Sequence, residues 1–100
     1  MDITLLYFDG CPNWTLARDR LEAAVRRAGL DERSLRYRDV ATPEEAETVG
    51  FPGSPTILID GRDPFGGQSA PVGFACRLYP TPAGPEGAPT VEQLLAVLSL

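Results

Sequence analysis

The sequence predicts a single α/β domain whose elements follow the order β-α-β-α-β-β-α. Three observations support this fold class. The chain has 100 residues, the size of one compact domain. Short runs rich in β-forming residues alternate with segments in which apolar residues recur at helical spacing. Two threonine-initiated capping patterns mark the starts of helices. A single domain over residues 1–100 is therefore expected.

The first strand and the first helix are separated by a tight turn. Residues 3–8 (ITLLYF) form an apolar run that Asp9 and Gly10 close, which is typical of a buried strand followed by a turn. From Pro12 onward, apolar residues recur every three or four positions until Gly29. This pattern predicts a long helix with Pro12 at its first position.

The second strand and the second helix follow directly. Residues 35–40 alternate between apolar and charged side chains, as in a strand with one partly wet face. Thr42 and Pro43 predict the N-cap and first turn of a short helix, and Gly50 ends it. A right-handed crossover would place the first two strands side by side and parallel.

The second half of the chain is predicted to hold two more strands and a final helix. Residues 56–60 and 73–79 are both β-rich and are expected to pair across residues 61–72, which form a mobile loop or a binding element. Residues 80–89 should be extended or turning because they carry four prolines. Thr90 and Gln93 form a capping box ahead of the last helix.

Charge and composition exclude several classes of function. A net charge of −5 opposes binding to nucleic acid and to acidic membrane surfaces. We see no export signal and no membrane span, and two cysteines are too few for a secreted disulfide scaffold. With no histidine in the chain, the usual zinc sites cannot be assembled. We therefore expect a cytoplasmic protein, a monomer or weak dimer, with no metal site and no cofactor.

Cys11 is the residue most suited to chemistry. It follows the first strand and precedes the first helix, so we expect an exposed thiol at the start of that helix. A helix N-terminus carries unpaired N–H groups and a partial positive charge, which stabilise a thiolate. The alternative is that Cys11 is only a small capping residue in a protein without redox function.

The order of elements, Cys11-Pro12 at the strand-to-helix turn and Ser54-Pro55-Thr56 before the third strand together resemble the thioredoxin-like superfamily. The resemblance implies a four-stranded mixed sheet with helices on both faces. It also implies a nucleophilic role for Cys11. Ser54, before a cis-proline at Pro55, would bind and orient the backbone of a partner.

Trp14 occupies the position of the resolving cysteine in the family's C-x-x-C motif, so exchange within the motif is impossible. Two interpretations of Cys76 stay open: it is a packed core thiol, or it replaces the missing cysteine from a fourth strand antiparallel to the third. Trp14 is expected in the core or at its rim, where it and Pro12 would shape substrate access. The expected function is thiol–disulfide exchange with a disulfide-containing protein or a low-molecular-weight thiol.

The chain is also similar to small actinobacterial thioredoxin-like proteins that are often labelled alkylmercury lyase. That chemistry needs two thiols and a carboxylate, and Asp9 is the acidic residue nearest to Cys11 in sequence. The competing hypothesis is therefore a non-catalytic module that binds a thiophilic metal through both cysteines. A domain that binds peptides in a groove beside Pro55 is a further alternative.

Overall fold

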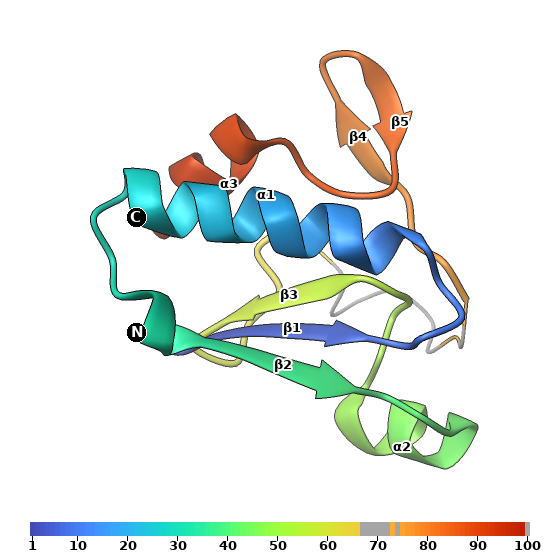
Figure 1. Cartoon of the computed structure of the whole chain (residues 1–100). Helices are drawn as coiled ribbons and strands as arrows, with labels where there is room; N and C mark the ends of the chain where they lie inside the picture. Colours follow the sequence, from blue (N-terminus) through green and yellow to red (C-terminus); the bar gives the residue numbers. More distant parts are fainter. Residues whose placement is uncertain (67–72, 74, 100) are drawn as a thin grey trace.

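The chain forms an α/β fold in which helices cover a small mixed sheet (Figure 1). The structure is a computed structural model, and it describes residues 1–66, 73 and 75–99. The helices of this described part are α1 (Asn13–Arg27), α2 (Pro43–Val49), α3 (Val91–Leu98) and the 3-10 helix η1 (Glu32–Ser34). Its strands are β1 (Ile3–Tyr7), β2 (Leu35–Asp39), β3 (Thr56–Ile59), β4 (Tyr79–Thr81) and β5 (Gly84–Glu86).

The central sheet has the strand order β2-β1-β3. β1 and β2 are parallel, with Leu5 opposite Tyr37, and this confirms the arrangement predicted from the crossover. β3 lies antiparallel on the other side of β1, with Ile57 opposite Leu5. The carboxyl end of β1, from which the chain enters α1, therefore lies beside the start of β3.

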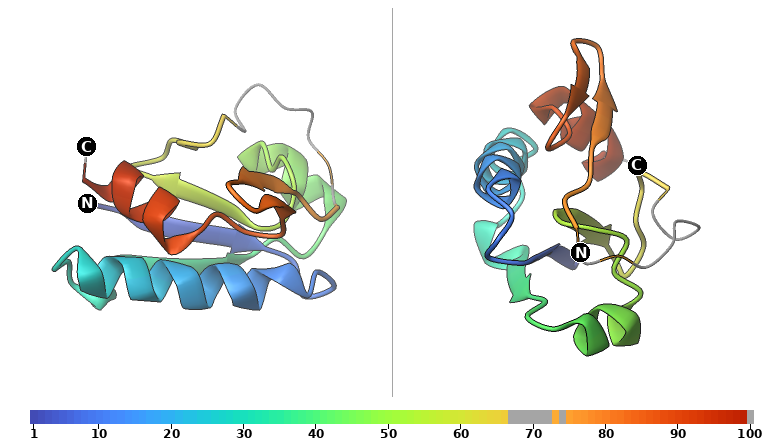
Figure 2. Two further views of the ribbon diagram at one scale, coloured as in Figure 1. Left: turned by 90° about the horizontal axis from the view of Figure 1, so that it is seen from above. Right: turned by 90° about the vertical axis from the view of Figure 1, so that its right-hand side faces the viewer.

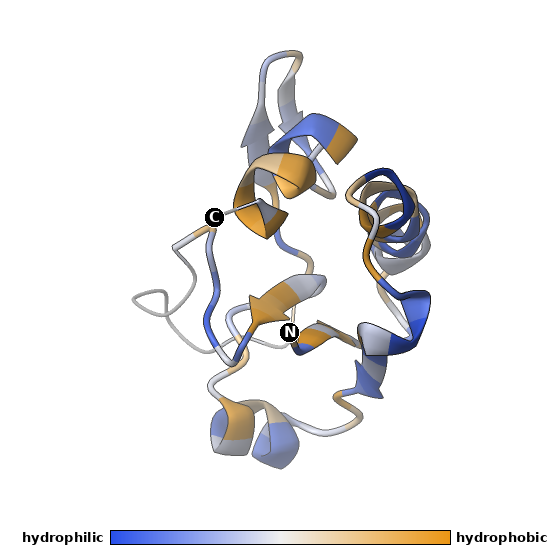
Figure 3. Ribbon diagram, turned by 90° about the vertical axis from the view of Figure 1, so that its left-hand side faces the viewer, coloured by the Kyte–Doolittle hydropathy of each residue, from blue (hydrophilic) through white to orange (hydrophobic). Residues whose placement is uncertain are grey.

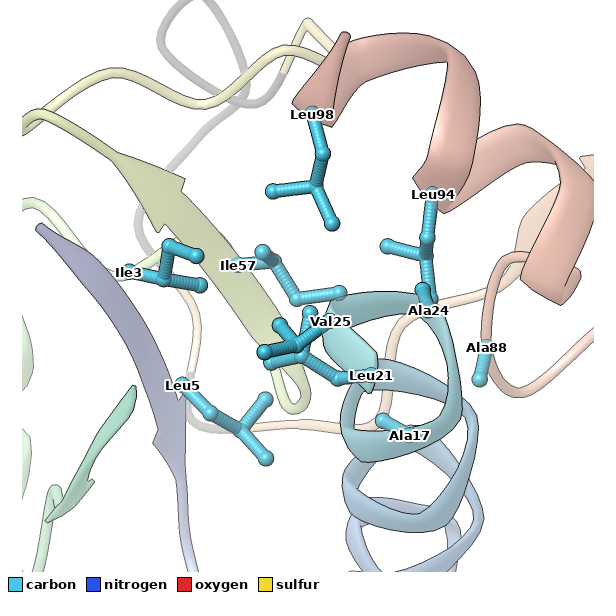
Figure 4. Close-up of a cluster of buried hydrophobic side chains, with 10 residues drawn as sticks. All are labelled: Ile3, Leu5, Ala17, Leu21, Ala24, Val25, Ile57, Ala88, Leu94 and Leu98. Carbon is cyan, nitrogen blue, oxygen red and sulfur yellow. The ribbon is translucent and has the colours of Figure 1, made fainter. Parts of the chain in front are cut away.

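The two faces of the sheet pack against different helices, because successive side chains of a strand point to opposite faces. Ile3, Leu5 and Ile57 belong to the larger core, which is completed by α1, α3 and Ala88 (Figure 4). Leu6 belongs to a second cluster with residues of α2 and its flanking segments, Val40, Ala46 and Phe51. Helices on both faces of the sheet are thus confirmed.

The helices α1 and α3 differ in hydropathy, as expected from this packing. In Figure 3, α3 is mostly hydrophobic and α1 carries much polar surface. The α1 residues buried against the sheet are Ala17, Leu21, Ala24 and Val25. Their spacing of three or four residues places them on one stripe of the helix.

The predicted helix starts are largely confirmed. The Thr42 hydroxyl accepts from the backbone N–H of Glu45 at the start of α2. Thr90 and Gln93 form the complete capping box of α3. Pro12, in contrast, is the N-cap residue of α1 rather than its first helical residue. Its side chain cannot accept a hydrogen bond, so the cap is not made by a side chain.

A fourth strand of the central sheet is not formed in the described part of the chain, so that prediction is wrong. β4 pairs with β5 in a separate hairpin, which extends away from the sheet (Figure 2). In the segment 73–79, which was expected to be a strand of the sheet, Leu78 is 65% exposed. Tyr79 is buried instead, and the side chain of Arg77 is only 12% exposed. Arg77 and Tyr79 therefore face inward, whereas Cys76 and Leu78 are exposed.

Within the described residues, the structure contains no helix with the length and apolar character needed to cross a membrane.

Candidate thiol site

The two cysteines meet at the end of the sheet where β1 leads into α1. The Cys76 thiol donates to Cys11 Sγ, and the two sulfurs are 2.7 Å apart. Both cysteines are free. Residues 65 positions apart in the sequence thus form one dithiol site.

Cys11 lies in the short turn between β1 and α1. Its N–H donates to the Phe8 carbonyl at 3.1 Å, and its thiol donates to the Ser54 carbonyl at 3.5 Å. Cys11 is fully buried, so the predicted exposed thiol is wrong. The physical reason is that the loop before β3 and the segment around Cys76 both pack over the start of the helix, and the sequence pattern of a single turn cannot show this.

The loop before β3 is held against the β1–α1 turn. The Ser54–Pro55 peptide bond is cis, and both residues are buried. The Ser54 hydroxyl accepts from the Phe8 N–H at 3.3 Å. The buried Tyr79 hydroxyl donates to the Pro55 carbonyl at 2.5 Å. The loop is thereby fixed from both sides.

Residues 75–77 run alongside Ser54. The Ser54 N–H donates to the Ala75 carbonyl at 2.8 Å, and the Arg77 N–H donates to the Ser54 carbonyl at 2.7 Å. Cys76 therefore forms a parallel bridge with Ser54 rather than belonging to a strand antiparallel to β3. The backbone groups of Ser54 that were expected to bind a partner are engaged within the chain itself.

Gly53 allows this close approach. A Cβ atom at this position would lie 3.1 Å from the Ala75 carbonyl oxygen and 3.1 Å from Arg77 Cβ, and its φ of +129° is one that side chains rarely adopt. A glycine is thus required both by the backbone conformation and by the neighbouring segment.

A buried ion pair anchors the segment that carries Cys76, and sequence reasoning missed it. Arg77 Nη1 lies 2.6 Å from Asp63 Oδ2, with side chains 12% and 2% exposed. The same guanidinium donates to Thr56 Oγ1 at 3.2 Å and to the Phe65 carbonyl at 3.3 Å. It also lies 4.4 Å from the centroid of the Tyr79 ring. No short motif in the sequence links these residues, which fold topology alone brings together.

Cys76 differs from Cys11 in its environment. It is exposed, so its interpretation as a packed core thiol is wrong. The hydrogen bond that it donates to Cys11 raises the pKa of the Cys76 thiol, with a smaller contribution from burial. The Cys76 thiol therefore has a smaller thiolate fraction at a given pH than it would have without this hydrogen bond.

The remaining candidate residues lie around the helix start. Trp14 is half-buried against the main core and stacks on Tyr7, with ring centroids 4.1 Å apart. This confirms the expected core or rim position. Pro12 and Asp9 are exposed. Asp9 thus lies at the surface, whereas Cys11 is buried.

A larger set of metal ligands does not gather at the thiols. In the part of the chain that the structure describes, no group of three or more cysteine or carboxylate side chains is placed to share a metal ion. The site has only the two sulfur atoms as soft ligands. Comparisons with protein-family models, curated proteins and solved structures found no match to this chain.

Proposed function

We propose that the protein is a thiol–disulfide oxidoreductase of thioredoxin-like fold that acts through the Cys11–Cys76 pair. The observation that carries the proposal is the 2.7 Å contact between the two sulfurs. A disulfide bond is about 2.05 Å long, so a closure of less than about 1 Å joins the pair. Two-electron oxidation therefore requires little rearrangement of the backbone.

The thioredoxin-like assignment is supported by the arrangement around the thiols. A parallel β1–β2 pair, an antiparallel β3, a cysteine at the start of α1 and a cis-proline before β3 occur together. The departure is that the second cysteine comes from residue 76. Cys76 supplies the second thiol of the pair, a role that Trp14 cannot fill because it has no thiol.

The proposed reaction is exchange between the dithiol and disulfide forms of the protein. In the reducing cytoplasm the pair would rest as two thiols, as the structure has them. A partner disulfide accepts two electrons and two protons and becomes two thiols as the pair forms its own disulfide. In the reverse direction, a partner with thiols reduces the Cys11–Cys76 disulfide and is itself oxidised to a disulfide. The partner is a protein or a low-molecular-weight thiol.

The geometry favours this function over a metal-binding module. Linear coordination of one soft ion by two thiolates, with metal–sulfur bonds of about 2.3 Å, places the sulfurs roughly 4.6 Å apart. The observed separation of 2.7 Å is shorter than this, so metal binding would require the two sulfurs to move apart, whereas disulfide formation requires them to move together. Peptide binding beside Pro55 is also disfavoured, because Pro55 is buried and the Ser54 backbone is already paired.

Alkylation of each cysteine, mapped by mass spectrometry before and after mild oxidation with diamide, tests the proposal. We expect both cysteines to lose their reactivity together, in a monomer that has lost two hydrogen atoms. The single variants Cys11→Ser and Cys76→Ser are the controls, because neither can form the internal bond. Unchanged alkylation of both cysteines in the oxidised wild type would rule the proposal out.

A further inference from the structure

The two sulfurs of the site differ in their access to a partner. Cys11 is fully buried, whereas Cys76 is exposed. We propose that Cys76 is the sulfur that forms the mixed disulfide with a thiol partner, and that Cys11 is the buried sulfur that leaves. This proposal rests on the proposed function and reverses the order of attack expected from the sequence.

The exposed position of Cys76 is fixed by the contacts of the residues beside it. Its neighbours on both sides, Ala75 and Arg77, are hydrogen-bonded to the backbone of Ser54. The Arg77 guanidinium is in turn held by buried Asp63. Cys76 therefore lies in a segment that is held by hydrogen bonds on both sides of it, and it is exposed while its neighbour Cys11 is buried.

The geometry of thiol exchange selects the outer sulfur. An attacking thiolate approaches a disulfide along the line of the S–S bond, opposite the sulfur that leaves, and access decides which sulfur is attacked. Because Cys76 is exposed, a thiolate in solution can reach its sulfur. Cys11 offers no such access, because it has no exposed surface.

The leaving sulfur is placed where an anion is tolerated. Cys11 precedes α1, a helix of 15 residues whose first turn contains no acidic side chain. The positive partial charge of the helix start therefore acts on a Cys11 thiolate unopposed from within the first turn. A thiolate that is better stabilised leaves faster.

The properties of Cys76 in the two redox states indicate which class of partner reacts with the protein. The hydrogen bond to Cys11 raises the pKa of the Cys76 thiol, which lowers the thiolate fraction of the exposed sulfur in the dithiol form. In the oxidised form this exposed sulfur is the one that a thiolate can reach, because Cys11 is fully buried. The access to Cys76 therefore points to a thiol as the substrate, which the oxidised protein converts to a disulfide.

A partner with two thiols is oxidised by two successive exchange steps. One partner thiolate bonds to Cys76 Sγ, the Cys11–Cys76 bond breaks, and its electron pair leaves on Cys11 Sγ, which takes up a proton. The second partner thiolate then attacks the partner's own sulfur in the mixed disulfide, and Cys76 leaves and is protonated. The partner is oxidised to a disulfide and the protein is reduced to a dithiol.

Trapping the mixed disulfide tests the assignment on the wild-type protein. The protein is oxidised with diamide, freed of oxidant, mixed with excess glutathione, quenched in acid at short times and alkylated before peptide mapping. We expect glutathione on Cys76 and the alkyl group on Cys11, with at least about a tenfold excess over the opposite pattern. Glutathione mainly on Cys11, or equally on both, would overturn the assignment.

The oxidised protein before glutathione is added serves as the internal control. If both cysteines still alkylate at that stage, no internal disulfide has formed and the proposed function itself fails. If the disulfide is present and glutathione appears on Cys11, the redox pair stands and only the order of attack is wrong. The two failures are therefore distinguishable.

Discussion

Removing Asp63 should destabilise the fold and loosen the thiol site together. In Asp63→Ala the Arg77 guanidinium stays buried and retains its bonds to Thr56 and to the Phe65 carbonyl, but it loses its counter-charge. Breaking a buried pair in this way costs about 3 to 5 kcal/mol. The retained hydrogen bonds place the expected loss near the lower end, at about 3 kcal/mol.

Urea unfolding of the reduced protein measures this loss, and a thermal melt should show a fall of roughly 12 to 24 °C in Tm. The matched control is Glu32→Ala, which removes the exposed Arg26–Glu32 pair, with side chains 60% and 52% exposed, and should cost about 0.5 kcal/mol or less. A loss below about 1 kcal/mol in Asp63→Ala would show that the buried pair does not stabilise the fold as proposed. Because Arg77 follows Cys76, the variant should also form the internal disulfide less favourably in glutathione buffers.

Three further perturbations test the site. Gly53→Ala should lower the free energy of unfolding by about 1 to 3 kcal/mol and weaken the internal disulfide, whereas Gly61→Ala, which has a positive φ but open space, should leave the disulfide unchanged. Burial raises the pKa of Tyr79, so the unfolded chain releases this proton above about pH 10 while the native protein keeps it. Stability in urea should therefore fall above about pH 10, and fall less steeply in Tyr79→Phe; equal slopes would contradict this. Cys11→Ala removes the acceptor that raises the pKa of Cys76, so Cys76 should alkylate faster at pH 8 than in the reduced wild type; an unchanged rate would count against the hydrogen bond.

Local sequence signals predicted most of the elements correctly. The first three strands, the capping of α2 and α3 by Thr42 and Thr90, and the parallel β1–β2 pair all follow from short-range patterns. Such patterns act within a few residues, where capping and side-chain alternation are decided. The cis bond before Pro55 followed from family resemblance, since the local sequence carries no signal that fixes it.

The errors concern residues whose environment depends on distant parts of the chain. One interpretation of the sequence made Cys76 a packed core thiol, but buried Asp63 draws Arg77 inward, and Cys76 and Leu78 are exposed. A shift of one residue in a strand-like segment exchanges its two faces. The burial of Cys11 has a different cause, because the loop before β3 and the segment around Cys76 pack over the start of α1. Neither environment is visible in a local pattern.

An equilibrium titration in glutathione redox buffers tests directly whether Cys11 and Cys76 form a reversible redox pair. The wild-type protein would be incubated over a range of ratios of reduced to oxidised glutathione, quenched in acid, alkylated and weighed intact. We expect one reversible transition in a monomer between a form with two alkylated cysteines and a form with none, in which Cys11 and Cys76 are joined. Glutathione adducts or intermolecular dimers at every ratio, with no internal disulfide, would contradict it.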